Sequence, residues 1–170
     1  MRKFAMNYGA IMGMILVALT IVLDQLGVDT MNAKWLNIIN YLVFIGFIIY
    51  GTYQYREASE GFISYPQALK LGTSIVFFSS LILAFYIFVY ANFINPDLIE
   101  EILLKSEEQI WVQNPNISDE EMEVALSMVE KFTTPTMMSV MTILSQSFMG
   151  FIFSLLTSLF LRNNKPEFEA

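Results

Sequence analysis

Four long stretches without a formal charge constrain most strongly what this chain can fold into. They contain 20, 21, 26 and 30 residues and lie between the pairs Lys3 and Asp24, Lys34 and Arg56, Lys70 and Asp97, and Lys131 and Arg162. A helix needs about 20 apolar residues to cross a hydrocarbon core about 30 Å thick. The sequence therefore predicts an all-α integral membrane protein, a four-helix bundle with spans at residues 4–25, 35–55, 68–93 and 135–161.

Composition supports the same class. Charged residues make up 15% of the 170 residues and the mean hydropathy is +0.54. In a soluble domain, about a quarter of all residues are charged. The first stretch follows Arg2 and Lys3, as a secretory signal would. Its apolar run is longer than a usual signal core, and no small-x-small cleavage site precedes Asp24, so we expect it to remain as a membrane helix. We expect one membrane domain over residues 1–170 in contact with the lipid bilayer.

The distribution of lysine and arginine predicts how the spans are oriented. With both termini on one side, six basic residues fall on that side and three on the other. Because Lys and Arg favour cytoplasmic loops, we expect a multi-pass protein of the cell (inner) membrane, with both termini cytoplasmic. Twelve of the 16 acidic residues then lie outside the cytoplasm.

Most of those acids fall in residues 95–132, which we expect to form an extracytoplasmic helical hairpin. Pro96 opens the first helix, and the "NPN" at 114–116 ends it. Ser118 and Glu121 have the spacing of a capping box at the start of the second helix. The apolar faces of the two helices would meet each other or lean on the bilayer. Two alternatives are a docking surface for a basic partner and a weak divalent-ion site, although the segment lacks the spaced oxygen ligands of a calcium loop.

The short polar segment before the third span predicts a re-entry turn on the cytoplasmic side. Gly61 allows a sharp turn, Ser64 caps the next helix with Gln67 returning the hydrogen bond, and Pro66 falls in its first turn. Arg56 and Lys70 flank the turn and can extend their charged ends to the headgroups.

The same segment carries a resemblance. "YREASEGFISYPQALKLG", an aromatic-Arg end of one span followed by the Gly-x-Ile-Ser-Tyr-x-x-Ala-x-Lys-x-Gly start of the next, resembles domain-of-unknown-function family 4199, uncharacterised four-span membrane proteins common in the Bacteroidetes. The resemblance covers nearly the whole chain and implies a short four-span protein with an acidic segment before the last span. It implies no activity, cofactor or catalytic residue. It does imply importance for Gly61, Ser64, Ala68, Lys70 and Gly72.

Small residues within the spans predict where helices pack. Gly9 and Gly13 form a GxxxG pattern on the first span, for packing within the bundle or for a homodimer seam. Gly46 is a candidate on the second span, and Gln146 is the strongly polar residue near the middle of the fourth. We interpret Gln146 as an interhelical hydrogen-bonding group, with a substrate ligand as the alternative. Further packing candidates are Gly51, Ser139, Thr142, Ser145 and Gly150.

The sequence favours no catalytic, cofactor or metal site. Histidine and cysteine are absent, which removes the commonest transition-metal ligands and the usual proton shuttle. The acidic balance disfavours nucleic-acid binding. We therefore expect no enzyme, but a structural or regulatory membrane subunit that binds a membrane or envelope protein partner; a homo-oligomer is left open. The alternative is a small transporter or channel, oligomeric or not, in which Gln146, Asn40 and hydroxyl side chains line a path.

Overall fold

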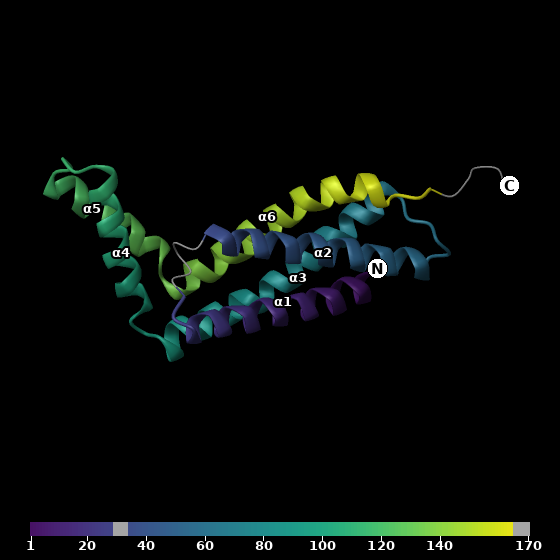
Figure 1. The fold of residues 1–170 in the computed structure, drawn as a ribbon, viewed down its shortest axis with the longest axis horizontal. Helices are drawn as coiled ribbons and strands as arrows, with labels where there is room; N and C mark the ends of the chain where they lie inside the picture. The colour runs from purple at the N-terminus through teal and green to yellow at the C-terminus, as the bar shows by residue number, and fades with distance from the viewer. Residues whose placement is uncertain (29–33, 165–170) are drawn as a thin grey trace. The chain divides into compact units, whose positions relative to one another are not determined.

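The computed structural model describes residues 1–28 and 34–164, and this part of the chain is almost entirely helical (Figure 1). The elements in chain order are α1 (Arg2–Gln25), α2 (Lys34–Ala58), α3 (Tyr65–Val89), the π-helix η1 (Tyr90–Ile94), α4 (Leu98–Gln113), α5 (Asp119–Phe132) and α6 (Pro135–Leu161). Four of the helices, namely α1, α2, α3 continued by η1, and α6, are long and apolar enough to cross a membrane. The predicted all-α membrane helical bundle is confirmed.

The third span differs in detail from its predicted range of 68–93. It begins at Tyr65, directly after the predicted cap, and changes to a π-helix at Tyr90. There the amide of Asn95 donates to the carbonyl oxygen of Tyr90 at 2.8 Å, a bond over five residues. The Asn92 side-chain amide donates to the Phe88 carbonyl oxygen at 2.7 Å, which gives that carbonyl a partner where the helix widens.

Contacts divide the chain into two compact units. The first comprises Met1–Leu83 and Ile143–Ala170, and the second comprises Ala84–Thr142. The first unit therefore contains α1, α2 and most of α3 and α6. The second contains the end of α3, η1, the hairpin of α4 and α5, and the start of α6.

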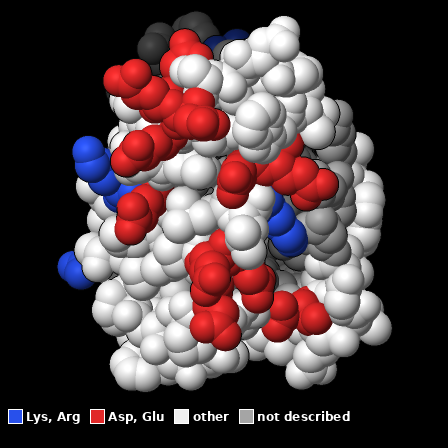
Figure 2. Space-filling model, turned by 90° about the vertical axis from the view of Figure 1, so that its left-hand side faces the viewer, with Lys and Arg blue, Asp and Glu red and all other residues white. Residues whose placement is uncertain are grey.

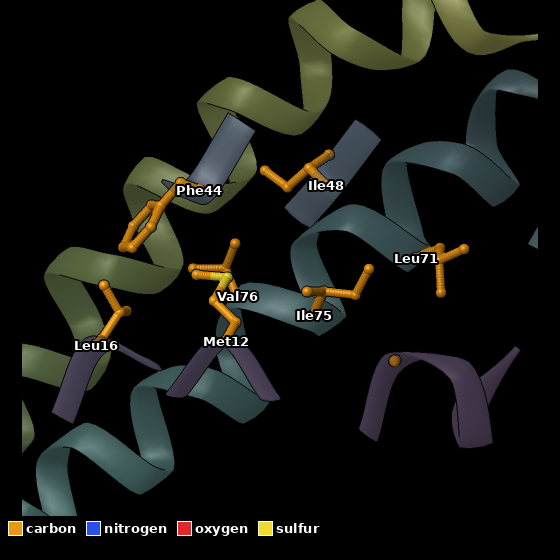
Figure 3. Packing of buried hydrophobic residues seen from close by; sticks show 8 residues of the cluster. Met12, Leu16, Phe44, Ile48, Leu71, Ile75 and Val76 are labelled. Atoms are coloured by element: carbon orange, nitrogen blue, oxygen red, sulfur yellow. The ribbon is translucent and has the colours of Figure 1, made fainter. Parts of the chain in front are cut away.

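The core of the first unit is built by buried apolar side chains from three helices. Figure 3 shows how they meet: Met12 and Leu16 from α1, Phe44 and Ile48 from α2, and Leu71, Ile75 and Val76 from α3. All are at most 4% exposed. In hydrocarbon such contacts hold helices together by close packing, because lipid is as apolar as the side chains.

Side-chain neighbours establish the direction of each helix in the first unit. The rings of Phe4 and Tyr55 lie 5.4 Å apart, and those of Tyr8 and Tyr50 lie 5.7 Å apart. Residue numbers therefore rise along α1 as they fall along α2. Close contacts pair Gly72 with Ser154 and Val76 with Gly150, so α3 and α6 are antiparallel as well. The start of α1 and the end of α2 thus lie at one end of the bundle, as the predicted topology requires.

The hairpin is the centre of the second unit, and α5 begins with the predicted capping box. The Glu121 amide donates to Ser118 Oγ at 3.3 Å, and the Ser118 amide donates to Glu121 Oε2 at 3.1 Å. Ser118 Oγ also lies 3.0 Å from Glu121 Oε2. The backbone and hydroxyl of Ser118 lower the pKa of the Glu121 carboxyl below its ordinary value. The charged form of Glu121 is therefore the one that the folded helix prefers.

We predict that Ser118→Ala destabilises α5 by about 0.5–2 kcal/mol, since the Glu121 amide loses the Ser118 Oγ that accepts its hydrogen bond. The Glu121 contribution is present above the unfolded-state pKa and is lost as pH falls through the lower folded-state pKa, so the wild-type helix should weaken in acid. Amide hydrogen exchange in α5 measures both effects. Ser127→Ala, within the same helix, is the matched control and should keep the protection; equal protection in Ser118→Ala would contradict the prediction.

Candidate functional site

The two glycines of the GxxxG pattern lie at the contact between α1 and α3. A Cβ built on Gly9 would lie 2.6 Å from the Ile75 carbonyl oxygen, and one on Gly13 would lie 2.9 Å from Ile82 Cβ. Both glycines are buried. They are therefore used for packing within the chain, one of the two alternatives that the sequence left open.

Gly46 differs from the sequence-based expectation. It is exposed, and no atom lies within 4 Å of the position that a Cβ would occupy. It is therefore not a packing contact among the described residues, because it lies on the face of α2 turned away from the core. The close contacts of α2 are instead at Gly51, where a Cβ would lie 2.6 Å from Ile75 Cδ1.

Polar side chains inside the first unit form a second group. The Oε1 atom of Gln146 and the Oγ of Ser147 are buried on α6 without a hydrogen-bond partner, as is the Ser79 hydroxyl on α3. The antiparallel pairing of Val76 with Gly150 places residues 79 and 80 level with residues 146 and 147. Gln146 is thus one of several buried polar groups on α3 and α6, and the predicted interhelical bond through its Oε1 is absent among the described residues.

The re-entry turn is held by its backbone and by one side chain. Glu60 and Gly61 have φ of 56° and 83°, the left-handed region that favours glycine. The Ser64 amide donates to Gln67 Oε1 at 3.0 Å, which is the returning half of the predicted capping box. Pro66 lies in the first turn of α3, where a missing amide hydrogen does no harm.

The two basic residues that flank the turn differ in their surroundings. The Arg56 guanidinium lies 5.2 Å from the centre of the Tyr53 ring, in position for a cation–π contact. Lys70 is exposed. Both positions suit residues at the edge of a membrane, where a long apolar stem and a charged end meet different surroundings.

The turn is joined to the chain after α6, which sequence reasoning missed. Ile63 and Asn163 form an antiparallel bridge with backbone bonds of 2.9 and 2.8 Å, and Asn163 Nδ2 donates to the Gly61 carbonyl oxygen at 2.8 Å. A cavity of about 500 Å³ lies beside it, lined by Tyr55, Ala58, Ser59, Glu60, Phe62, Ile63, Ser64, Gln67, Asn163 and Asn164. Backbone bonds carry no residue signature, so only the asparagine after the last span could have pointed to this contact.

A small cleft lies between α1 and α2. Its volume is about 150 Å³, and Asn37 and Asn40 of α2 line it together with Thr20 of α1. Thr20 already donates to the Leu16 carbonyl oxygen at 2.9 Å. The residues that line the cleft do not include Gln146. Asn40 and Gln146, which the transporter alternative placed along one path, therefore do not line this cleft together.

A groove of about 530 Å³ lies between α4 and α5 in the second unit. Its floor is apolar and consists of Leu103, Leu104, Trp111, Met122 and Leu126. Five carboxylates surround it: Glu100, Glu107, Asp119, Glu123 and Glu130. In Figure 2, where α4 and α5 face the reader, acidic side chains lie around uncharged surface. The sequence predicted that the apolar faces of the hairpin meet each other or lean on the bilayer; between α4 and α5 they leave an open apolar strip between acids.

No group of three acidic side chains that could hold a metal ion occurs among residues 1–28 and 34–164. The weak divalent-ion site considered for the hairpin thus has no candidate ligand set in the described chain. The carboxylates of the groove are spread along it, which suits several separate cationic groups better than one ion.

Comparison with known proteins places the chain in a family. The family model described as a protein of unknown function, DUF4199, matches residues 7–163. The chain belongs to this family. The match includes the re-entry turn, whose Gly61, Ser64 and Lys70 carried the resemblance. No curated protein and no solved structure matches the chain. The match thus gives the family of the chain and supplies no activity.

Proposed function

We propose that this DUF4199 protein is a structural or regulatory membrane subunit that binds another protein, and that this role is not enzymatic. The observation that carries the proposal is the groove of the hairpin, whose floor contains Leu104 at 60% and Trp111 at 42% exposure. Large apolar side chains inside an acidic, water-facing segment favour a binding surface over a solvated one. The absence of His and Cys from the sequence agrees with a role without catalysis.

We also propose that the hairpin faces away from the cytoplasm and that both termini are cytoplasmic, in the inner membrane of a bacterial cell. The excess of basic residues on the side of the termini supports this orientation. The ring contact of Phe4 with Tyr55 and the bridge of Ile63 with Asn163 support a common end for the start of α1, the re-entry turn and the end of α6.

One set of single-cysteine variants tests both orientation and binding, because the chain has no native cysteine. Val124→Cys places a thiol on an exposed part of α5 outside the groove, and Ala58→Cys places one at the end of α2. In intact cells a membrane-impermeant maleimide should label the first and not the second. The reverse pattern would overturn the orientation.

A photo-cross-linker on the Val124→Cys thiol should then give one reproducible adduct in native membranes. The same label on Ala58→Cys controls for abundance and non-specific capture. The proposed subunit role would be abandoned if the labelled protein stayed solitary from both positions and the purified protein conducted a solute.

The second candidate function, a small transporter or channel, is favoured by the unpartnered buried polar atoms of α3 and α6. Gln146→Leu separates the two functions. If Gln146 only packs, the folded variant should carry the same solute flux as wild type in lipid vesicles, and its stability should be equal or higher because an unpartnered polar atom is removed. If Gln146 lines a path, flux should be lost while the protein still folds. Val140→Leu, on the exposed side of α6, is the matched control.

A further inference from the structure

We propose that the groove between α4 and α5 binds a basic amphipathic helix of a partner protein. The inference deepens the proposed function, on which it rests, by naming the chemistry of the partner and the surface that binds it. All residues of the groove lie in one compact unit, so its geometry depends only on the packing of two adjacent helices.

The kinds of residue that line the groove recur along both helices at a spacing of seven residues. On α4, Glu100 is followed by Glu107, and Leu104 is followed by Trp111; on α5, Glu123 is followed by Glu130. Seven residues are about two helical turns, or about 10.5 Å along the axis. A third helix laid along the groove meets the same pattern twice, with apolar contacts in the middle and a carboxylate on either side. This is the arrangement that pairs helices in coiled coils.

The charge of the rim determines the sign of the partner. Five carboxylates line the groove, and its lining contains no lysine or arginine. A neutral or acidic helix would bring no positive charge to these carboxylates. A helix with Lys or Arg on both sides of an apolar stripe would place cations near the carboxylates on both walls of the groove. Because the carboxylates are spread over both helices and form no metal-binding group within the described residues, they fit a row of cations better than one ion.

The same charge argues against the membrane surface as the occupant. Anionic headgroups repel an acidic rim, so a lipid surface would cover the floor only against this repulsion. The floor itself is accessible, since Leu104 and Trp111 are exposed while only Met122 is buried. A partner helix can contact both the floor and the rim, which a bilayer with negative charge cannot do.

Trp111 provides a direct probe of the groove. The chain has two tryptophans, Trp35 and Trp111, so Trp35→Phe leaves the indole in the groove as the only one. The ligand is a designed 21-residue helix with a leucine stripe flanked by lysines at heptad spacing. A peptide with glutamates in place of the lysines and a scrambled peptide of the same composition serve as controls. Titration into the full-length protein in neutral detergent should shift the Trp111 emission to the blue with the basic helix alone.

Charge reversal on both walls tests the rim. Glu107→Lys combined with Glu123→Lys should weaken binding of the basic helix by roughly tenfold or more and should permit binding of the acidic one. Glu101→Lys combined with Glu120→Lys makes the same change in net charge on hairpin positions outside the groove, and should change affinity by less than about threefold. Leu104→Ser should weaken binding, while Val112→Ser, exposed outside the groove, should not.

The proposal is overturned if the basic helix does not bind, if the acidic or scrambled peptide binds equally, or if the two charge-reversal variants behave alike. It is also overturned if brominated lipids quench Trp111 in reconstituted vesicles, since the bilayer would then cover the groove. A cross-linked native partner without peptide binding would refute the groove chemistry and leave the subunit role intact. If the peptide binds, but Val124→Cys captures no partner and the purified protein conducts a solute, the subunit role is refuted and the groove chemistry stands.

Discussion

Gly150→Ala is expected to lower the free energy of unfolding of the bundle by about 1–3 kcal/mol, whereas Gly46→Ala should leave it unchanged or raise it. A Cβ on Gly150 would lie 2.5 Å from Val76 Cβ, a β-branched side chain that is fully buried and has little freedom to move. At Gly46 the added methyl meets no neighbour and contributes only its higher helix propensity. The two variants add the same group to two membrane helices and differ only in what it meets.

Gly9→Ala extends the test to the contact of α1 with α3. Its Cβ would approach the Ile75 backbone oxygen at 2.6 Å, and backbone moves less readily than a side-chain end, so the loss should be at least as large as at Gly150. Unfolding with sodium dodecyl sulfate in mixed micelles, followed by circular dichroism, measures all three. If Gly46→Ala unfolds at the same detergent fraction as the other two, the contacts of α3 with α1 and α6 are not as described.

Asn163→Pro is expected to release the re-entry turn from the end of α6. Proline removes the amide that donates to the Ile63 carbonyl oxygen and the side chain that donates to Gly61, two bonds of 2.8 Å. Each hydrogen bond has a net contribution of about 0.5–1.5 kcal/mol, so the loss is about 1–3 kcal/mol. Asn163→Ala removes only the side-chain bond and should have the smaller part of this effect.

Hydrogen exchange of the Ile63 amide measures the release, because that amide donates to the Asn163 carbonyl oxygen at 2.9 Å. In Asn163→Pro its exchange should be about tenfold faster or more, since 1.4 kcal/mol corresponds to tenfold. Asn164→Ala keeps all three bonds and lines the same cavity, which makes it the matched control. Unchanged exchange in Asn163→Pro would show that the turn holds itself without α6.

Features encoded by neighbouring residues could be predicted from the sequence, and they were. The uncharged stretches predicted the four long helices, because lipid favours apolar length directly. Ser118 and Glu121 predicted the start of α5, since a capping box needs only residues three apart. The helix break at 114–116 follows from the same kind of local chemistry.

Features that depend on tertiary contacts could not be predicted. The bridge of Ile63 with Asn163 joins backbone atoms across about 100 residues, and backbone atoms are common to every residue. Gly46 and Gly150 look alike in sequence, and only the rotation of each helix decides which one is buried. The groove lies between these cases: the seven-residue spacing of Glu100 with Glu107 and Glu123 with Glu130 is visible in the sequence, and a hairpin was expected, but the rotation of each helix that leaves an open groove between them is not visible there.

The position of the two α1 glycines has a consequence for self-association. Both lie against α3, so the exposed surface of α1 consists mainly of larger side chains, among them Met14 at 58% and Val22 at 52% exposure, with Ala18 as a small exposed residue. A second copy approaching that surface would be kept at the spacing of ordinary helix pairs, about 8–10 Å between axes, without the backbone approach that small residues permit. For α1, a neighbouring copy would then offer contacts little different from those of acyl chains.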